Sequence, residues 1–298
     1  RAIDDGLIEG PRLFVSTLAI VATDSYGPGP RGFRPDIDLP GGAQEVSGSG
    51  EVMRAVREQA GHGADWIKVY ADYRIGTDGS AQPTFTADEL QALVEAAHAS
   101  GRPVAAHAAS DAGIRMAVEA GVDSIEHGTA GSAATFKLMR QRGVAYLPTL
   151  TAVESYGKYF EHYVPGQSPP TPEMREAERA FRAALSAGTT IGCGSDVGVF
   201  PHGENYREPV WMVRLGMSAT QALHACTSVA ARILRQEGRI GRIAPGLRAD
   251  LAAFAGDPSV RIEDLQHPRL VMKDGVVYRD PDAGTPASAP TQSDAPVR

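Results

Sequence analysis

The sequence is poor in cysteine and free of long apolar runs, and each shortage excludes a class of protein. Two cysteines, Cys193 and Cys226, are too few for a disulfide framework or a cysteine-based zinc site. No stretch of about 18 apolar residues occurs, so the sequence predicts no membrane span. The 29 basic residues are outnumbered by 36 acidic ones and form no basic run, which argues against a nucleic-acid partner.

Motifs of two other classes are also missing. Without a G-x-S-x-G turn, a serine triad of the α/β-hydrolase kind has no support. Without a phosphate-binding glycine loop after a strand, nucleotide binding has none either. No signal peptide is visible, but the sequence begins with Arg1 rather than Met, so the compartment stays open between the cytoplasm and a secreted or periplasmic location.

What the sequence does contain is an alternation of short apolar segments and amphipathic ones. Its 298 residues, 42% of them hydrophobic, suit one large domain or two unequal ones. Thr86 with Glu89, and Ser218 with Gln221, have the spacing of a capping box that opens a helix. We expect strands at residues 12–20, 65–71, 103–106, 122–126, 144–148 and 189–194, and helices at residues 51–60, 86–100, 111–120, 133–142, 171–187 and from 218 onward.

Strands that alternate with helices form a parallel sheet with right-handed crossovers. The sequence therefore predicts an α/β fold, a partial TIM-type (β/α)8 barrel, with a doubly wound open sheet as the rival. The six predicted strands are two fewer than a closed barrel needs. We assign the barrel to residues 1–236, part of a small β-sandwich domain to 237–280, and a disordered tail to 281–298.

Four polar side chains lie at or near the ends of different predicted strands. Lys68 lies in DWIKVYA, His107 in PVAAHA, His127 in SIEHGT and Asp196 in GCGSDVG. Because active groups of α/β barrels lie at the carboxyl ends of strands, we expect these four to meet at one mouth. Each alone has a structural explanation, such as a hydrogen-bonded histidine or a turn-capping aspartate. Together they indicate a site for Zn²⁺ or a similar divalent ion.

The lysine adds a specific possibility to that site. Burial lowers the pKa of a lysine amine and exposes its neutral form, which can take up CO₂ to give a carbamate. A carbamate at Lys68 would be an anionic, two-oxygen ligand able to bridge two metals that share one water. Asp196 would then take the proton from that water and return it to a leaving amine.

The ordered set of motifs resembles the amidohydrolase superfamily, and most of all its imidazolonepropionase and Xaa-Pro dipeptidase-like branch. The four quoted segments resemble the family's strands 4, 5, 6 and 8, and two further segments agree: ENYREPVWMVRLGMSATQALHACTSVAA, and GRIAPGLRADLAAFAGDP with its trailing VMKDGVVY. The resemblance covers roughly residues 1–280. It implies two metals bridged by carboxylated Lys68, the second metal held by His107 and His127, and Asp196 on the first. It also implies hydrolysis of an amide, peptide or cyclic C–N bond with a metal-activated water.

One departure from the family is plain. The family carries a His-x-His pair at the end of its first strand, and no such pair occurs in this sequence. We therefore expect an N-terminally truncated chain that keeps the family's strands 3–8 and lacks the strand with that pair. A barrel without part of its wall would expose unpaired strand edges, so we do not expect this chain to be active alone.

Several secondary residues and functions stay open at this stage. Tyr70, Arg74 and His202 could bind the substrate, Arg74 through its fork to a carboxylate, although ordinary loop residues look the same. Strand alternation should point Glu126 away from the site, and Cys193 reads as a small core residue. The substrate would be a small molecule or a dipeptide, and a homo-oligomer is open. A cyclic amide or lactam hydrolase and a non-catalytic binding relic are the alternatives.

Overall fold

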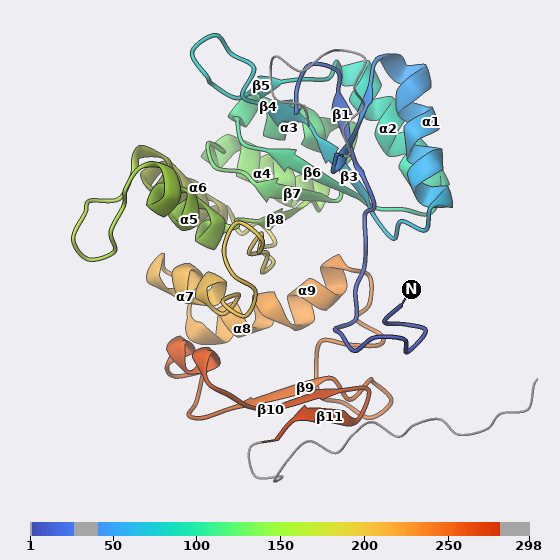
Figure 1. The fold of residues 1–298 in the computed structure, drawn as a ribbon. Helices are drawn as coiled ribbons and strands as arrows, with labels where there is room; N and C mark the ends of the chain where they lie inside the picture. Colours follow the sequence, from blue (N-terminus) through green and yellow to red (C-terminus); the bar gives the residue numbers. More distant parts are fainter. Residues whose placement is uncertain (1, 27–40, 281–298) are drawn as a thin grey trace, which may run out of the picture.

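Six parallel strands form the main sheet of the protein (Figure 1). The computed structural model describes residues 2–26 and 41–280. The strand order is β2–β1–β3–β6–β7–β8, and Ile191 adds a single parallel bridge to Tyr146 beyond β8. The strands are β1 (Ala19–Ala22), β2 (Ala43–Val46), β3 (Ile67–Tyr70), β6 (Val104–Ala108), β7 (Ser124–His127) and β8 (Ala145–Leu147).

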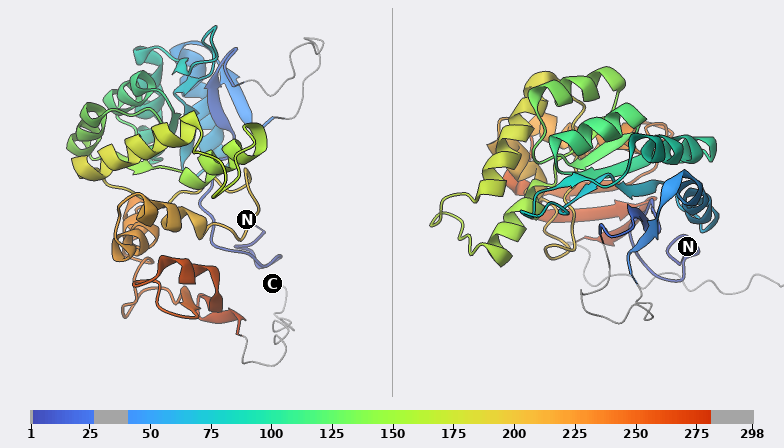
Figure 2. Two further views of the ribbon diagram at one scale, coloured as in Figure 1. Left: turned by 90° about the vertical axis from the view of Figure 1, so that its left-hand side faces the viewer. Right: turned by 90° about the horizontal axis from the view of Figure 1, so that it is seen from above.

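Helices return the chain from one strand to the next and pack as a consecutive layer against the sheet (Figure 2). The helix with the predicted capping box begins as expected, because the Thr86 hydroxyl accepts from the Glu89 backbone N–H while the Glu89 carboxylate accepts from Thr86 N–H. The layer consists of α1 (Gly48–Gly61), α2 (Ala87–Ala99), α3 (Asp111–Ala120), α4 (Ala133–Arg142) and α6 (Pro172–Ala187).

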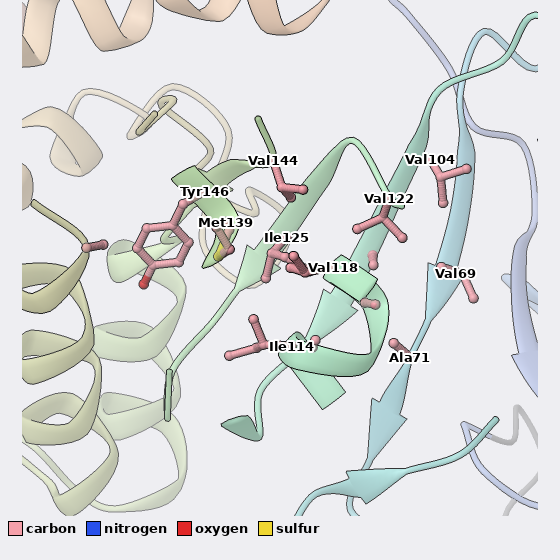
Figure 3. Packing of buried hydrophobic residues seen from close by; sticks show 14 of the residues in the cluster. Val69, Ala71, Val104, Ile114, Val118, Val122, Ile125, Met139, Val144 and Tyr146 are labelled. Carbon is pink, nitrogen blue, oxygen red and sulfur yellow. The ribbon is translucent and has the colours of Figure 1, made fainter. Parts of the chain in front are cut away.

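The core lies between this helix layer and one face of the sheet. Figure 3 shows Ile114 and Val118 of α3 lying over Val122 and Ile125, and all four are buried. Burying one such aliphatic side chain stabilises the fold by about 1.5–3 kcal/mol, so this face supplies the main stability of the sheet. Because side chains alternate along a strand, the residues between these core residues point to the opposite face of the sheet.

The expected strands are confirmed in kind, with three differences in extent. Of the expected strand at 12–20, only the end that belongs to β1 is a strand. The earlier part is not, because Val15 exchanges its hydrogen bonds with Asp65 and Trp66 outside any strand ladder. The strand β2 is additional to the expected ones, and residues 27–40 just before it lie outside the described part of the chain. The expected strand at 189–194 is reduced to the bridge at Ile191.

The remaining elements close one end of the sheet and form a second, smaller sheet. Helices α5 (Leu150–Phe160), α7 (Arg207–Arg214), α8 (Ala219–Cys226) and α9 (Ser228–Ile233) follow β8, and α5 packs on α6 and α7. A short hairpin of β4 (Asp72–Tyr73) and β5 (Gln82–Pro83) follows β3. The small sheet is antiparallel in the order β11–β10–β9, with β9 (Leu251–Phe254), β10 (Pro268–Lys273) and β11 (Val276–Arg279), and the 3₁₀ turn Ile262–Gln266 precedes β10.

The segment before β1 lies beside the small sheet, far from it in sequence (Figure 1). Arg12 pairs with Asp250 at 2.9 Å and with Asp274 at 3.0 Å, and the Lys273 amine donates to the carbonyl of Gly10 at 2.6 Å. These contacts tie the two ends of the described chain together. The expected boundary between residues 236 and 237 remains a prediction, and the expected tail at 281–298 lies outside the described residues.

Cys193 is not the unpaired core residue that we expected. It forms a disulfide with Cys226, which ends α8, across a sequence separation of 33 residues. The reason is geometric, because the chain after Ile191 passes α8 closely enough for Cys193 N–H to donate to the Ala225 carbonyl. Within the described ranges, no helix is both long and apolar enough to cross a bilayer, in line with the expectation.

Candidate active site

A cavity of about 380 Å³ lies at the carboxyl ends of the parallel strands. His107 is the next-to-last residue of β6 and lies opposite Tyr70 of β3, and His127 ends the next strand opposite Ala108. Asp196 follows the bridge at Ile191. The structure therefore brings three of the four predicted residues to one cavity, whose walls also include Tyr26, Tyr70, Tyr73, Arg74, Thr149, Tyr156 and Glu173.

The two histidines are neighbours in this cavity and are held neutral. Their ring centroids lie 4.6 Å apart in an edge-to-face arrangement. Burial lowers the pKa of His127 to about 3, and burial together with the nearby His127 lowers the pKa of His107 well below its usual value. The Thr149 hydroxyl contacts Nδ1 of His127 at 2.8 Å. Two neutral imidazoles in a shared hollow are the form in which histidine binds a metal.

Lys68, the fourth predicted residue, lies deeper on the same face of the sheet. Burial lowers the pKa of its amine, while the negative charges of Glu126 and Asp196 oppose that shift. Its Nζ stands 5.6 Å from the centroid of the Tyr70 ring. The lysine therefore interacts with the carboxylates of Glu126 and Asp196 and lies near the ring of Tyr70.

The expectation for Glu126 is wrong. It shares the inner face of β7 with Ser124, whose hydroxyl donates to its carboxylate at 2.7 Å, and it interacts electrostatically with Lys68. Burial raises the pKa of Glu126. The expectation failed because His127 leaves the strand geometry with a φ of 72°, so the alternation cannot be counted back from it. Gly128 permits that turn, since a Cβ there would stand 2.5 Å from the Tyr146 ring.

Three residues of the cavity share an uncommon backbone conformation. His127, Thr149 and Asp196 have φ values of 72°, 49° and 56°, in the left-handed region that costs a residue with a Cβ of order 1–3 kcal/mol. His127 ends β7, Thr149 follows β8 closely, and Asp196 lies on the segment after the bridge at Ile191. Asp196 is exposed toward the open cavity, yet the surrounding protein raises the pKa of its carboxyl through partial desolvation.

Tyrosines and one ion pair form the side of the cavity. The ring of Tyr70 stacks between Tyr26 and His107, with centroid distances of 4.6 and 4.5 Å. Arg74 pairs with Glu173 of α6 at 3.3 Å, and both side chains line the cavity. The side wall therefore offers flat apolar surfaces and one exposed guanidinium.

Of the predicted substrate-binding residues, two line the cavity and one does not. Tyr70 and Arg74 do, whereas His202 is exposed and is not part of its lining. Asp72 is fully buried, and its carboxylate accepts from the backbone N–H groups of Ala109 and Ser110, so it shapes the loop after β6. One of its oxygens stands 3.7 Å from Nε2 of His107.

The donor set suits a divalent ion in kind. Two neutral imidazoles, a carboxylate and a lysine with a lowered pKa are side chains that zinc sites use, the lysine only as its carbamate. Among residues 2–26 and 41–280, no three His, Cys, Asp or Glu side chains stand close enough together to hold a metal by themselves.

Sequence reasoning missed Thr149 and Glu208, which support the site from behind. Both lie in segments with a visible signal, because Thr149 directly follows an expected strand and Glu208 is an acidic residue inside an apolar helix pattern. Glu208 is fully buried and caps the helix that begins after Thr149. Neither feature says from sequence alone which partner the side chain meets.

Comparison with known proteins identifies the family of the chain. Residues 1–278 match the amidohydrolase family. An uncharacterised protein of Mycobacterium tuberculosis is 34% identical over 251 residues, which are 82% of this chain and 66% of that protein. An ochratoxinase of Aspergillus niger is 29% identical over 310 residues, covering 95% of this chain and 63% of the enzyme.

A solved structure agrees with these sequence matches. The crystal structure of a Xaa-Pro dipeptidase with bound methionine in its active site superposes with a TM-score of 0.83 at 35% identity, over 93% of this chain and 70% of that one. The main sheet and helix layer are those of such amidohydrolase barrels. The chain spans about two thirds of the length of the curated relatives that it matches, 66% and 63%.

Proposed function

The chain belongs to the amidohydrolase family, and from this premise we propose that it is a metal-dependent hydrolase of an amide bond in a small substrate such as a dipeptide. The observation that carries the proposal is the convergence of His107, His127 and Asp196, from three separate strand ends, on one cavity of about 380 Å³. A cavity of that size suits a ligand of one or two amino-acid residues. The names of the similar dipeptidase and ochratoxinase support the same reaction class.

His107, His127, Lys68 and Asp196 are the residues that we expect to hold the metal. A bound divalent ion supplies one kind of chemistry here, the activation of water and the polarisation of a carbonyl. Lys68 would take part as a carbamate, formed when its neutral amine adds CO₂ and releases a proton. Glu126 would be a neighbour of that anion, because it interacts electrostatically with Lys68, and burial raises its pKa above that of an ordinary glutamate.

Asp196 is the residue that we expect to move the proton. Its carboxylate faces the open cavity, and its raised pKa makes it a better base than an ordinary aspartate. It would accept a proton from the attacking water and deliver it to the leaving amine nitrogen as the C–N bond breaks. One carboxyl group thereby serves both steps and ends the cycle in its starting state.

The wall of the cavity supplies the means to orient a substrate. The guanidinium of Arg74 can bind a carboxylate through two parallel N–H groups. The stacked rings of Tyr26 and Tyr70 offer a flat apolar face to a proline or aromatic side chain. Together they favour an amino-acid amide or dipeptide that ends in a free carboxylate.

A zinc-loaded preparation tested on a substrate panel examines this proposal. The panel contains Xaa-Pro dipeptides, N-acyl aromatic amino acids and lactams, with and without a chelator. In a longer version that supplies the family's His-x-His strand, we expect turnover of open-chain amides that the chelator abolishes, and loss of that turnover in Asp196→Asn with zinc still bound. Unchanged turnover in Asp196→Asn would sink the assigned role, and unchanged zinc uptake after replacement of both His107 and His127 would sink the metal site.

A further inference from the structure

We propose that Glu208 is a positioning residue for His127, acting through the first turn of α5 and through Thr149. The inference rests on the proposed function in treating His127 as part of the site. Its evidence is separate, because it consists of contacts behind the cavity wall. Glu208 does not line the cavity, so apart from its electrostatic interaction with Asp196, its effect on the site passes through the residues between them.

Glu208 lies on α7 and reaches the beginning of the neighbouring helix α5. Its side chain has no solvent exposure, and its two carboxylate oxygens accept from Leu150 N–H at 2.9 Å and Thr151 N–H at 2.8 Å. The Thr151 hydroxyl donates to it as well, at 2.8 Å. These N–H groups have no acceptor inside the helix, so Glu208 supplies from another helix the cap that α5 lacks.

Thr149 stands immediately before these two capped residues and is held in an unfavourable backbone conformation. Its φ of 49° and ψ of 41° are left-handed, which a β-branched residue rarely adopts. Such a conformation persists only when the surroundings fix it. Here the cap fixes the chain on one side, and the hydrogen bond from Thr149 N–H to the Gly194 carbonyl fixes it on the other.

The consequence of this conformation is the direction of the Thr149 hydroxyl. Its Oγ1 lies 2.8 Å from Nδ1 of His127 and is buried with the rest of the residue. A hydrogen bond at one ring nitrogen decides the tautomer of a neutral imidazole. The hydroxyl can donate or accept, and we assign it here as the acceptor of Nδ1–H, which leaves the lone pair of His127 on Nε2, where it can serve as a ligand.

A second glutamate at the same helix pair provides the matched control. Glu154 lies on α5 and pairs in the opposite direction, with Arg207 and the Trp211 indole of α7. It is also buried, but it does not touch the first turn of α5 or Thr149. A change at Glu154 therefore weakens the packing of α5 on α7 without releasing the cap.

The test is the tautomer of His127 in the metal-free 298-residue chain, read from long-range ¹H–¹⁵N correlation spectra of labelled histidine. Spectra of His127→Gln identify its signals. We expect the Nδ1–H form in the wild type, and mixed tautomers in Thr149→Val, Glu208→Gln and Glu208→Asp. Thr149→Ser, which keeps the hydroxyl, should restore the wild-type pattern. Glu154→Gln should retain that pattern even if its Tm falls.

The outcomes separate positioning from stability and from the proposed reaction. Glu208→Asp keeps the charge while shortening the reach, so it tests the proposal if Glu208→Gln does not fold. An unchanged tautomer in a folded Glu208 variant, or an equal change in Glu154→Gln, would overturn the proposal. Because no metal or substrate is added, an absent hydrolase activity would leave this result unaffected.

Discussion

His107 and His127 meet edge to face with 4.6 Å between their ring centroids, although they end two different strands. The parallel register brings the two residues near each other, because His107 pairs with Glu126 and His127 is the next residue along, and the left-handed backbone at His127 turns its ring toward the same cavity. Two neutral imidazoles at the ends of adjacent strands therefore lie side by side. Their joint environment is therefore a property of the sheet and not of a flexible loop.

The first prediction concerns zinc binding by these two rings. His107→Asn and His127→Asn should each weaken zinc binding at least tenfold, about 1.4 kcal/mol, because each removes one neutral nitrogen donor. Titration against a chromophoric chelator measures the change. His202→Asn is the control, since that histidine is exposed and outside the cavity lining. Equal affinity in all three variants would contradict the prediction.

A second prediction follows from the buried neighbours Lys68 and Glu126. Lys68→Met should destabilise the protein by about 3 kcal/mol, because breaking a buried pair leaves one charged partner uncompensated. The double variant Lys68→Met/Glu126→Gln should recover most of that loss. Urea denaturation at pH 8 measures the wild type, Lys68→Met, Glu126→Gln and the double variant. Losses that simply add in the double variant would show that the two side chains do not interact.

The third prediction is a pH dependence that belongs to Glu208. Burial raises the pKa of this carboxyl to about 7 in the folded protein, above its ordinary value of 4.5. The folded state therefore holds the proton more tightly, and stability falls as the pH rises from 4.5 to 7, by about 3 kcal/mol in total. In Glu208→Gln this component should vanish, so denaturation at pH 5 and pH 8 should give more similar free energies of unfolding than in the wild type.

Glu154 serves as the control for this measurement because its shift has the opposite sign. Its pKa is lowered by hydrogen bonds from Trp211, Lys158 and Arg207, which outweigh burial. Its contribution is present above the unfolded pKa and is lost as the pH falls through the folded value. Glu154→Gln should therefore change the pH slope in the other direction, and a change in the same direction would count against both assignments.

A fourth prediction concerns the disulfide between Cys193 and Cys226. Closing a loop with a separation of 33 residues restricts the unfolded chain, which corresponds to about 3–4 kcal/mol of stability in the chain-entropy account. Cys193→Ser/Cys226→Ser should lower the Tm, and addition of a reductant should lower it by a similar amount in the wild type only. If the reductant leaves the Tm of the wild type unchanged, the disulfide is not formed in solution.

The regular part of the fold could be predicted because its signals are local. Thr86 and Glu89 announce their helix by spacing alone, and Gly121 and Gly143 end helices in the left-handed conformation that glycine adopts readily. The apolar strand cores at Ile67 and Ile125 likewise mark buried strands. The expected convergence of His107, His127 and Asp196 followed from strand-end positions, and the structure brings them to one cavity.

What sequence reasoning could not supply depends on contacts between distant segments. The bond between Cys193 and Cys226 requires the close passage of the chain past α8. The inward direction of Glu126 depends on the backbone turn at His127, and the partner of Glu208 lies 57 residues away at Thr151. Such pairings are decided by packing, which a single sequence does not display.

The left-handed backbone at His127, Thr149 and Asp196 creates a conflict between the thermal stability of the protein and the side chains that its cavity holds. Glycine or asparagine would relieve the strain at each of these positions and raise the melting temperature. Each such exchange would also delete a side chain that the cavity needs. Laboratory evolution for thermal endurance alone should therefore drift toward these replacements, whereas parallel selection for amide hydrolysis should keep all three residues and find its stabilising changes elsewhere.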